Sequence, residues 1–249
     1  MQPEIHVGSL TLQTFGIMFA LGFAAAGVLM AIRLSELGKP VDWAYEIVFA
    51  GLLGGFVGAR AYYMAQHWDS VRHDVFGTVF SGEGLVWYGG AIGGAIAVMA
   101  WARYRRFLTL ALLDLAAPAL AIGYAIGRIG CQLSGDGDYG KASGLPWAMS
   151  YPDGTVPTTD RVHPTPVYET LAMGMIAWVL WNLRDRVRPG ILFALYLLLS
   201  GAERFLVEFV RRNDQVVAGL TAPQVESLAL MAIGSAWLAL AARRRPATA

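Results

Sequence analysis

Long apolar runs alternate with short polar segments along almost the whole chain. Each run has about 20 residues, which is the length that an α-helix needs to cross the roughly 30 Å hydrocarbon core of a bilayer. The seven runs cover residues 10–32, 43–64, 84–102, 107–128, 164–183, 190–210 and 221–242. The pattern therefore predicts an all-α polytopic membrane protein with seven transmembrane helices, forming a single integral-membrane domain over residues 1–249.

The second and third runs carry glycines three and four positions apart. They are Gly51, Gly54, Gly55 and Gly58 in the second run, and Gly89, Gly90, Gly93 and Gly94 in the third. Small residues at this spacing let two helix backbones approach closely. We therefore expect the glycine faces of these helices to pack tightly.

The basic residues of the short loops indicate the orientation, because they accumulate on the cytoplasmic side of a membrane. If the N-terminus lies outside, the inner segments carry Arg33, Lys39, Arg103, Arg105, Arg106, Arg184, Arg186, Arg188, Arg243, Arg244 and Arg245. The outer segments then carry only Arg72, Lys141, Arg161, Arg211 and Arg212. This asymmetry predicts an outside N-terminus and a cytoplasmic C-terminus.

Two longer loops, 65–83 and 131–163, fall on the outer face in this topology. The second is rich in Gly, Pro, Asp and Thr and contains a turn-forming sequence at residues 151–154. We expect it to form a small extracytoplasmic head between helices four and five.

Composition supports the membrane assignment and excludes several other classes. The chain is 56% hydrophobic and 15% charged with a mean hydropathy of +0.48, whereas soluble domains are about 25% charged. The 19 basic and 18 acidic residues give no electrostatic case for nucleic acid binding. Residues 1–8 lack the basic stretch of a cleavable signal peptide. A single cysteine cannot form an intramolecular disulfide, and without a nucleotide-binding glycine motif or clustered Cys/His spacing we expect no cofactor and no metal.

Arg128 ends the fourth run and is the first candidate for chemistry. A charged side chain at the edge of the hydrocarbon is costly unless a partner holds it. Its guanidinium, next to the glycine-rich stretch that contains Gly130 and Gly140, could clamp a phosphate through two hydrogen bonds. It could also be a helix-end arginine that extends to the interface.

Arg204 and Glu208 are four apart, which suits an intrahelical ion pair, but ionisable groups in an apolar span also indicate a functional site.

Further polar residues occur at helix ends. His163 and Glu169 lie at the start of the fifth run, Tyr88 precedes Gly89 and Gly90, and Asp114 lies inside the fourth run. Each has an ordinary explanation by itself, such as an interface anchor, an ion pair or a member of an aromatic belt. Together we expect them to converge on the outer halves of their helices.

The order and spacing of these motifs resemble the prolipoprotein diacylglyceryl transferase family over about residues 10–240. The matching motifs are Gly58-Ala59-Arg60-Ala61-Tyr62-Tyr63, Tyr88-Gly89-Gly90, Asp114 with Ala117-Pro118, Gly127-Arg128-Ile129-Gly130, His163-Pro164 with Tyr168-Glu169, and Arg204 with Glu208. The resemblance implies a multi-pass protein of the bacterial cytoplasmic (inner) membrane with its active site toward the periplasmic face. It also implies transfer of the diacylglyceryl group of phosphatidylglycerol to the lipobox cysteine thiol of a preprolipoprotein, with release of glycerol phosphate.

On this resemblance we expect the site residues to fall into two groups. The catalytic group is Arg128, Arg204, Tyr88, Asp136 and His163. The substrate-binding group is Arg60, Gly89, Gly90, Asp114, Gly130, Gly140, Glu169 and Glu208. The arginines would hold the phosphate, and Glu208, Asp136 and Asp114 would orient them or hold the glycerol hydroxyl.

The chain departs from the family pattern around the expected catalytic residues. Cys131-Gln132, Ser134 and Asp136 replace the usual Asn-Phe, Asn and Glu, with one extra residue before Gly140, Tyr88 replaces a histidine, and Phe15 replaces a tyrosine. The general base is therefore open among Tyr88, His163 and Asp136, with Tyr88 slightly preferred.

Three alternatives remain at this stage. Cys131 could act as a transient nucleophile beside Arg128, although a small residue filling the place of the family's Asn is the preferred interpretation. A divergent relative could transfer a lipid to a different acceptor. Glycine-rich packing and intramembrane charges also occur in transporters and channels.

Overall fold

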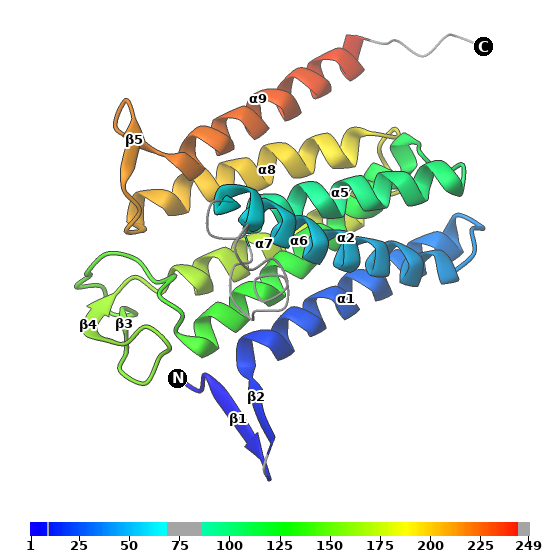
Figure 1. Cartoon of the computed structure of the whole chain (residues 1–249). Helices are drawn as coiled ribbons and strands as arrows, with labels where there is room; N and C mark the ends of the chain where they lie inside the picture. The colour runs from blue at the N-terminus through cyan, green and yellow to red at the C-terminus, as the bar shows by residue number, and fades with distance from the viewer. Residues whose placement is uncertain (9, 69–85, 244–249) are drawn as a thin grey trace. The chain divides into compact units, whose positions relative to one another are not determined.

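The computed structural model describes residues 1–8, 10–68 and 86–243, and it is predominantly helical (Figure 1). Its helices are α1 (Thr14–Glu36), α2 (Asp42–Gln66), α5 (Trp87–Tyr104), α6 (Leu110–Ser134), α7 (Thr165–Leu183), α8 (Ile191–Val207) and α9 (Ala222–Arg243). Each of them lies on one of the predicted apolar runs. The predicted start of the third run at Gly84, most of the 65–83 loop with Arg72, and Arg244 and Arg245 lie outside the described residues.

Four helices among those residues are long and apolar enough to cross a membrane. They are α1, α2, α6 and α9, with mean hydropathies between 1.4 and 2.3. This confirms the membrane class.

Three short antiparallel hairpins were not predicted. They are β1 (Glu4–Val7) with β2 (Leu10–Gln13), β3 (Met149–Tyr151) with β4 (Thr158–Val162), and β5 (Gln215–Val217) with β6 (Leu220–Thr221). The first of them corrects the start of the first run, because α1 begins at Thr14, whose backbone N–H donates to Pro3 O at 2.8 Å. The residues before Thr14 alternate apolar and polar in the two-residue period of a strand. This short alternation was not recognised because it leads directly into the long apolar run.

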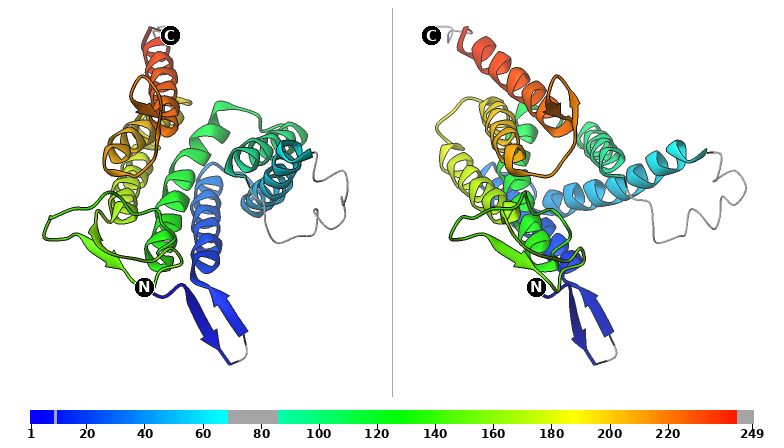
Figure 2. Two further views of the ribbon diagram at one scale, coloured as in Figure 1. Left: turned by 60° about the vertical axis from the view of Figure 1, so that its left-hand side comes forward. Right: turned by 90° about the vertical axis from the view of Figure 1, so that its left-hand side faces the viewer.

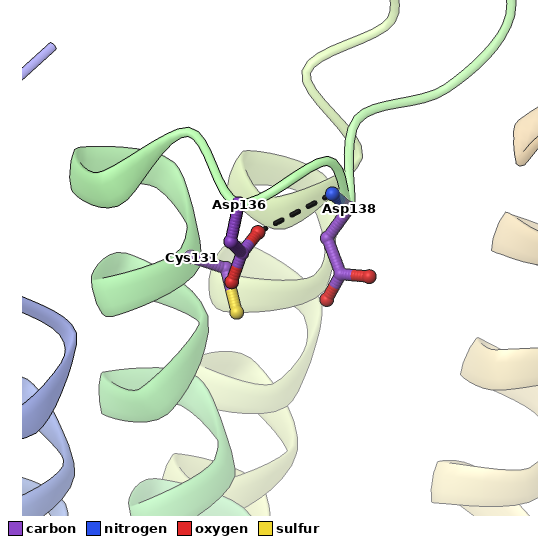
Figure 3. Close-up of side chains that lie close together, drawn as sticks. All are labelled: Cys131, Asp136 and Asp138. Carbon is purple, nitrogen blue, oxygen red and sulfur yellow. Dashed lines mark hydrogen bonds between the residues drawn. The ribbon is translucent and has the colours of Figure 1, made fainter. Parts of the chain in front are cut away.

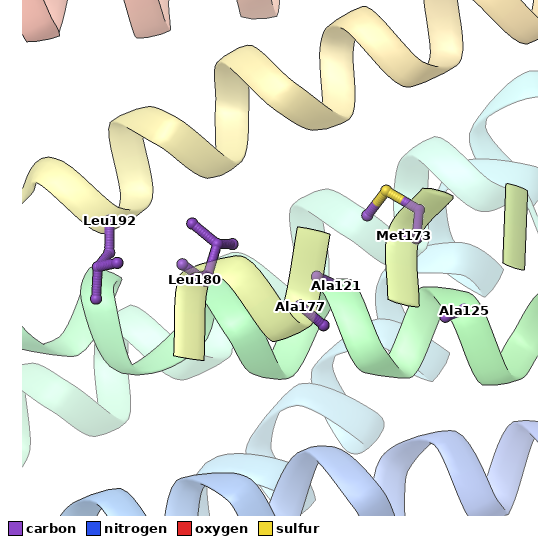
Figure 4. Packing of buried hydrophobic residues seen from close by; sticks show 7 residues of the cluster. Ala121, Ala125, Met173, Ala177, Leu180 and Leu192 are labelled. Carbon is purple, nitrogen blue, oxygen red and sulfur yellow. The ribbon is translucent and has the colours of Figure 1, made fainter. Parts of the chain in front are cut away.

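The chain divides into two compact units, one of Met1–Leu29 with Leu113–Ala249 and one of Met30–Leu112. In the first, α6, α7 and α8 meet around a core of alanines and larger apolar residues, shown in Figure 4: Ala117, Ala121, Ala125, Met173, Ala177, Leu180 and Leu192. Packing of α8 against α9 depends on Gly201, because a Cβ there would lie 2.9 Å from Ser227 O. The expectation of a single integral-membrane domain stays a prediction.

The head between α6 and α7 begins later than predicted. Helix α6 continues to Ser134 and ends at Gly135, whose φ of +60° is the left-handed conformation that commonly terminates helices. The predicted turn at 151–154 is confirmed by a hydrogen bond from Gly154 N to Tyr151 O at 3.2 Å. Figure 2 shows the head at the same end of α6 as the N-terminal hairpin, where Gln2 N donates to Leu133 O. The polar ends of this unit therefore gather on one side.

In the second unit, α2 and α5 cross at the glycines that were expected to allow close helix packing. A Cβ added at Gly58 would lie 2.3 Å from Gly89 O, and one at Gly93 would lie 2.3 Å from Gly54 O. No side chain fits at such distances, so these glycines allow the two backbones to touch.

Gly93→Ala should separate α2 from α5 and lower the free energy of unfolding by about 1–3 kcal/mol, the usual cost of overpacking. Thermal unfolding in detergent measures it. Gly55→Ala is the matched control, because its added Cβ would lie 3.5 Å from Gly90 O, an ordinary contact. Equal stability of the two variants would contradict the close crossing.

Candidate active site

Arg128, in the last third of α6, is held by carboxylates. Its Nη1 pairs with Asp138 of the head, and its Nε lies 3.2 Å from Glu169 Oε2 on α7. The guanidinium carbon lies 4.9 Å from the centre of the Tyr124 ring, one turn earlier on α6. The arginine therefore does not simply extend to the interface, because three elements fix its position.

Glu169 is the centre of the site. Its side chain is completely buried, and it accepts from donors on three elements. Arg204 Nη1 lies at 2.8 Å, Arg128 Nε at 3.2 Å, Arg211 Nη1 at 3.5 Å and the Tyr124 hydroxyl at 3.0 Å. From the sequence, an ion pair with one arginine could explain Glu169, whereas the structure shows three arginine partners.

The predicted ion pair between Arg204 and Glu208 is confirmed, with Arg204 Nη2 3.3 Å from Glu208 Oε2. Glu208 opens the 3-10 helix η1 (Glu208–Val210) that follows α8, and its side chain is buried. Its Oε1 accepts from Thr221 Oγ1 at 2.9 Å and from Asn213 Nδ2 at 2.5 Å. These contacts fix the carboxylate, and the carboxylate in turn positions Arg204.

Arg211 and Asp138 are the residues that sequence reasoning missed. The sequence pattern predicts an outer loop at Arg211, but this residue is only 7% exposed, and its Nη2 lies 2.5 Å from Asp138 Oδ1. A signal was present, because Arg204, Glu208 and Arg211 follow the spacing of one helix face. Asp138 had no such signal, since only folding of the head brings it to α6.

We call these six residues the arginine cluster: Arg128, Arg204, Arg211, Asp138, Glu169 and Glu208. Its three positive and three negative charges balance, as buried charges must. Burial alone would raise the pKa of Asp138, but Arg128 and Arg211 outweigh burial and hold that pKa below its ordinary value. Asp138 is therefore ionised at neutral pH.

Two guanidinium nitrogens of the cluster remain available for a ligand. Within the described part of the chain, Arg128 Nη2 and Arg204 Nε have no hydrogen-bond or ion-pair partner. Their side chains keep 16% and 23% of their surface exposed, against 9% for Arg211. Arg128 and Arg204 can thus accept an anion, whereas Arg211 is engaged through Nε and both Nη atoms.

Cys131 and Asp136 lie next to Asp138 of the cluster (Figure 3). The cysteine sulfur and one oxygen of each carboxylate are within 4.8 Å of one another, and Asp138 N donates to Asp136 Oδ1 at 3.3 Å. Arg128 Nη1 lies 3.7 Å from Cys131 Sγ. Because Asp138 already binds two guanidinium groups, their positive charges oppose a metal ion here.

Asp136 differs from Asp138 in its partners. Among the described residues it forms no ion pair, and burial raises its pKa above the ordinary value. A carboxylate in this state is a better base than a free aspartate at neutral pH.

His163 and Gly140 lie next to each other where the head joins α7. Nδ1 of His163 is 3.3 Å from the Tyr168 hydroxyl, which also accepts from Trp147 Nε1 at 2.8 Å. A Cβ at Gly140 would lie 2.3 Å from Val210 O and 3.0 Å from His163 Cβ. A Cβ added at Gly130 would lie 3.0 Å from Met18 Cβ, so glycine at this position lets α1 approach α6. Both glycines thus serve close packing around the site.

Asp114 does not join the arginine cluster. It lies 14 positions before Arg128, about 21 Å along α6. Its Oδ2 accepts from Gly190 N at 2.6 Å and its Oδ1 from Phe193 N at 3.0 Å, which caps the start of α8. The structure therefore does not bring Asp114 to the arginines that it was expected to orient.

The remaining predicted residues belong to the unit Met30–Leu112. Arg60 is buried on α2, with its guanidinium carbon 5.7 Å from the Tyr63 ring centre. Gly89 packs on α2, since a Cβ there would lie 2.4 Å from both Gly58 O and Tyr62 Cβ. A Cβ at Gly90 would meet only ordinary contacts, and Tyr88 is 43% exposed.

Comparison with known proteins gives one consistent result. The family model described as "Prolipoprotein diacylglyceryl transferase" matches residues 3–240. A protein of Clostridium tetani named phosphatidylglycerol–prolipoprotein diacylglyceryl transferase is 32% identical over 94% of this chain and 95% of its own length. Proteins with the same name from Dehalococcoides mccartyi and Janthinobacterium sp. are 34% and 32% identical over 91% and 98% of the chain, and over 88% and 96% of their own lengths.

Proposed function

The chain belongs to the prolipoprotein diacylglyceryl transferase family, and we propose that it transfers the diacylglyceryl group of phosphatidylglycerol to the lipobox cysteine thiol of preprolipoproteins, releasing glycerol phosphate. The observation that carries this proposal is the convergence of Arg128 and Arg204, from different helices, on Glu169. It leaves Arg128 Nη2 and Arg204 Nε, two guanidinium donors, available for a phosphate.

We propose that all seven helices cross the bacterial cytoplasmic membrane, with the N-terminus outside and the C-terminus in the cytoplasm. The uneven distribution of loop arginines supports this orientation. The arginine cluster, the head of residues 135–164 and the N-terminal hairpin then all face the periplasm, where lipobox cysteines arrive. The head is part of one membrane domain in this proposal.

In the reaction, the substrate thiolate attacks the glycerol carbon that carries the phosphate. A sulfur–carbon bond forms, the carbon–oxygen bond breaks, and its electron pair stays on the phosphate oxygen of the departing glycerol phosphate. Arg128 and Arg204 would stabilise that growing negative charge, the electrostatic effect that usually contributes most to catalysis. Glu169, Glu208 and Arg211 would act as positioning residues, because they hold the two arginines in place.

The thiol proton needs an acceptor, and the described site offers Asp136 and His163. We favour Asp136, because its carboxylate lies within 4.8 Å of Asp138, the partner of Arg128, carries no ion pair within the described part of the chain and has a raised pKa. His163 shares its Nδ1 with Tyr168. Tyr88 offers a phenol, and a free phenol is a poorer proton acceptor near neutral pH than a carboxylate or an imidazole.

Asp136→Asn should lower the rate of transfer by about 10²–10⁴, the usual contribution of a general base. In the unchanged protein the rate should fall as pH drops through the raised pKa of Asp136, since only its ionised form accepts a proton. The pH–rate profile of transfer to a lipobox peptide measures both effects. His163→Gln is the comparison: if it removes the acid limb and Asp136→Asn does not, then His163 is the base.

Cys131→Ala should retain nearly full activity. In this proposal the attacking thiol belongs to the substrate, and the buried Cys131 only fills space next to Asp136. Transfer rate, together with a search by mass spectrometry for a lipid adduct on Cys131, measures this. Loss of transfer accompanied by an adduct in the unchanged protein would establish the covalent alternative.

Mass spectrometry tests the proposed function as a whole. The purified protein is incubated with phosphatidylglycerol and a lipobox peptide, and we expect the peptide to gain one diacylglyceryl group as glycerol phosphate appears. An unmodified lipobox peptide with lipid attached to another acceptor would indicate the divergent transferase. Intact lipid, with a solute crossing liposomes that contain the protein, would indicate a transporter.

A further inference from the structure

The unit Met30–Leu112 contains a groove that the proposed reaction does not use. It has a volume of about 570 Å³ and is lined along most of its length by apolar residues, and ligand pockets commonly measure about 300–1,000 Å³. The apolar lining includes Phe49, Leu53 and Val57 of α2 with Ala97 and Ala100 of α5. The three α2 side chains are more than half exposed. The groove therefore opens toward the surroundings of the helices, where a hydrocarbon chain can enter.

One end of the groove is polar. Glu46 Oε2 accepts from Trp101 Nε1 at 2.6 Å and from Arg105 Nε at 2.8 Å, and Tyr104 lies beside them in the lining. Amphipathic rings at the end of a helix are typical of the headgroup level of a membrane. This end therefore lies at an interface, whereas the rest of the groove lies at the depth of the acyl chains.

The same end carries an excess of positive charge. The C-terminal turn of α5 and the two residues after it contribute Arg103, Arg105 and Arg106. Within the described residues, Arg103 and Arg106 form no ion pair, and Glu46 balances only Arg105. Lys39 is a further basic residue near this end, since its Nζ lies 6.0 Å from the ring centre of Phe107.

Contacts between aromatic rings complete the polar end. Phe107 lies 5.4 Å from Trp43, and Trp43 lies 5.7 Å from Trp101. Asp42 and Glu46 are the acidic residues of the first two turns of α2. Four basic residues, Lys39, Arg103, Arg105 and Arg106, therefore outnumber these two acidic ones. The balance favours an anionic headgroup.

We propose that this groove is a binding site for an anionic phospholipid, with one acyl chain along α2 and α5 and the phosphate at Arg105 and Arg106. Two of the five guanidinium donors of Arg105 go to Glu46, so its other Nη group can still bind a phosphate. In the proposed orientation the site faces the cytoplasmic leaflet, so it is separate from the periplasmic arginine cluster. An uncharged or zwitterionic lipid would gain the apolar contacts but not the charge interaction.

Photo-crosslinking in nanodiscs tests this proposal. The full chain is placed in bilayers that carry a tracer of phosphatidylglycerol or phosphatidylcholine with a diazirine on one acyl chain, and cross-linked peptides are identified by mass spectrometry. We expect labelling of residues 46–57 and 97–105 to be several-fold stronger with phosphatidylglycerol. Arg106→Gln should reduce that preference about fivefold, since a basic residue near an anionic membrane surface contributes about 1 kcal/mol.

Ala100→Phe should block the groove and remove most of the labelling. Ala95→Phe is its matched control, because Ala95 is an exposed alanine of the same helix that does not line the groove. Equal labelling by both lipids, or equal labelling of the two variants, would mean that only ordinary surrounding lipid is present and would overturn the proposal. The readout needs no turnover, so it is independent of the transferase assay.

Discussion

Replacing Arg128 with Lys should lower diacylglyceryl transfer to a lipobox peptide by about 10²–10³, the effect of removing one preorganised donor from a developing negative charge. Lysine keeps the positive charge but loses the planar fork. Its single ammonium group can bind Asp138 or Glu169. It cannot bind both carboxylates and still present a donor to a phosphate. Steady-state rates with phosphatidylglycerol in nanodiscs measure the effect.

The split between kcat and KM identifies the cause. An interaction that forms only as the carbon–oxygen bond breaks should lower kcat and kcat/KM together, whereas simple loss of lipid binding should raise KM alone. Arg212→Lys is the matched control. It changes an exposed arginine beside the same site, whose guanidinium carbon lies 4.3 Å from the Tyr139 ring centre. Unchanged kcat in Arg128→Lys would refute the phosphate assignment.

Much of the fold could be predicted from the sequence, because a hydrocarbon environment gives helices a strong apolar signal. The helix ends were less predictable. Gly135 ends α6 through its φ of +60° rather than through any change in polarity, so the apolar run gave no warning that the helix would continue past Arg128. The short hairpins were missed for a similar reason, since four-residue strands add little to a pattern read over 20 residues.

The site was predictable in part. Arg128, Arg204, Glu169 and Glu208 were found because ionisable groups in apolar spans need partners. The partners themselves depend on contacts between residues far apart in sequence. Asp138, on the head, binds Arg211, 73 positions later, and Asp114 resembles the site acids in sequence yet caps α8 at the other end of α6. Polarity and spacing cannot distinguish these two aspartates.

Glu169→Gln should lower the free energy of unfolding by about 3 kcal/mol, the cost of removing one partner from a buried ion pair. Glutamine has nearly the same shape, so the change removes one charge with little change in packing. The arginine cluster then has three positive charges and two negative ones in a site without water contact at Glu169. Thermal unfolding in detergent measures the loss.

Glu203→Gln is the matched control. Glu203 lies next to Arg204 on α8, but within the described residues it forms no ion pair, so its variant should keep nearly the stability of the unchanged protein. Equal destabilisation by the two substitutions would show that Glu169 has no special part in the cluster.

The same variant separates stability from substrate binding. Because Glu169→Gln leaves one unbalanced positive charge, a bound phosphate should restore the balance, so added phosphatidylglycerol should raise the unfolding temperature of the variant more than that of the unchanged protein. Transfer should still be slow, because Arg128 and Arg204 lose the carboxylate that positions both of them. If phosphatidylglycerol stabilises the variant no more than the unchanged protein, then the lipid phosphate does not bind at this cluster, and the mechanism that depends on it fails.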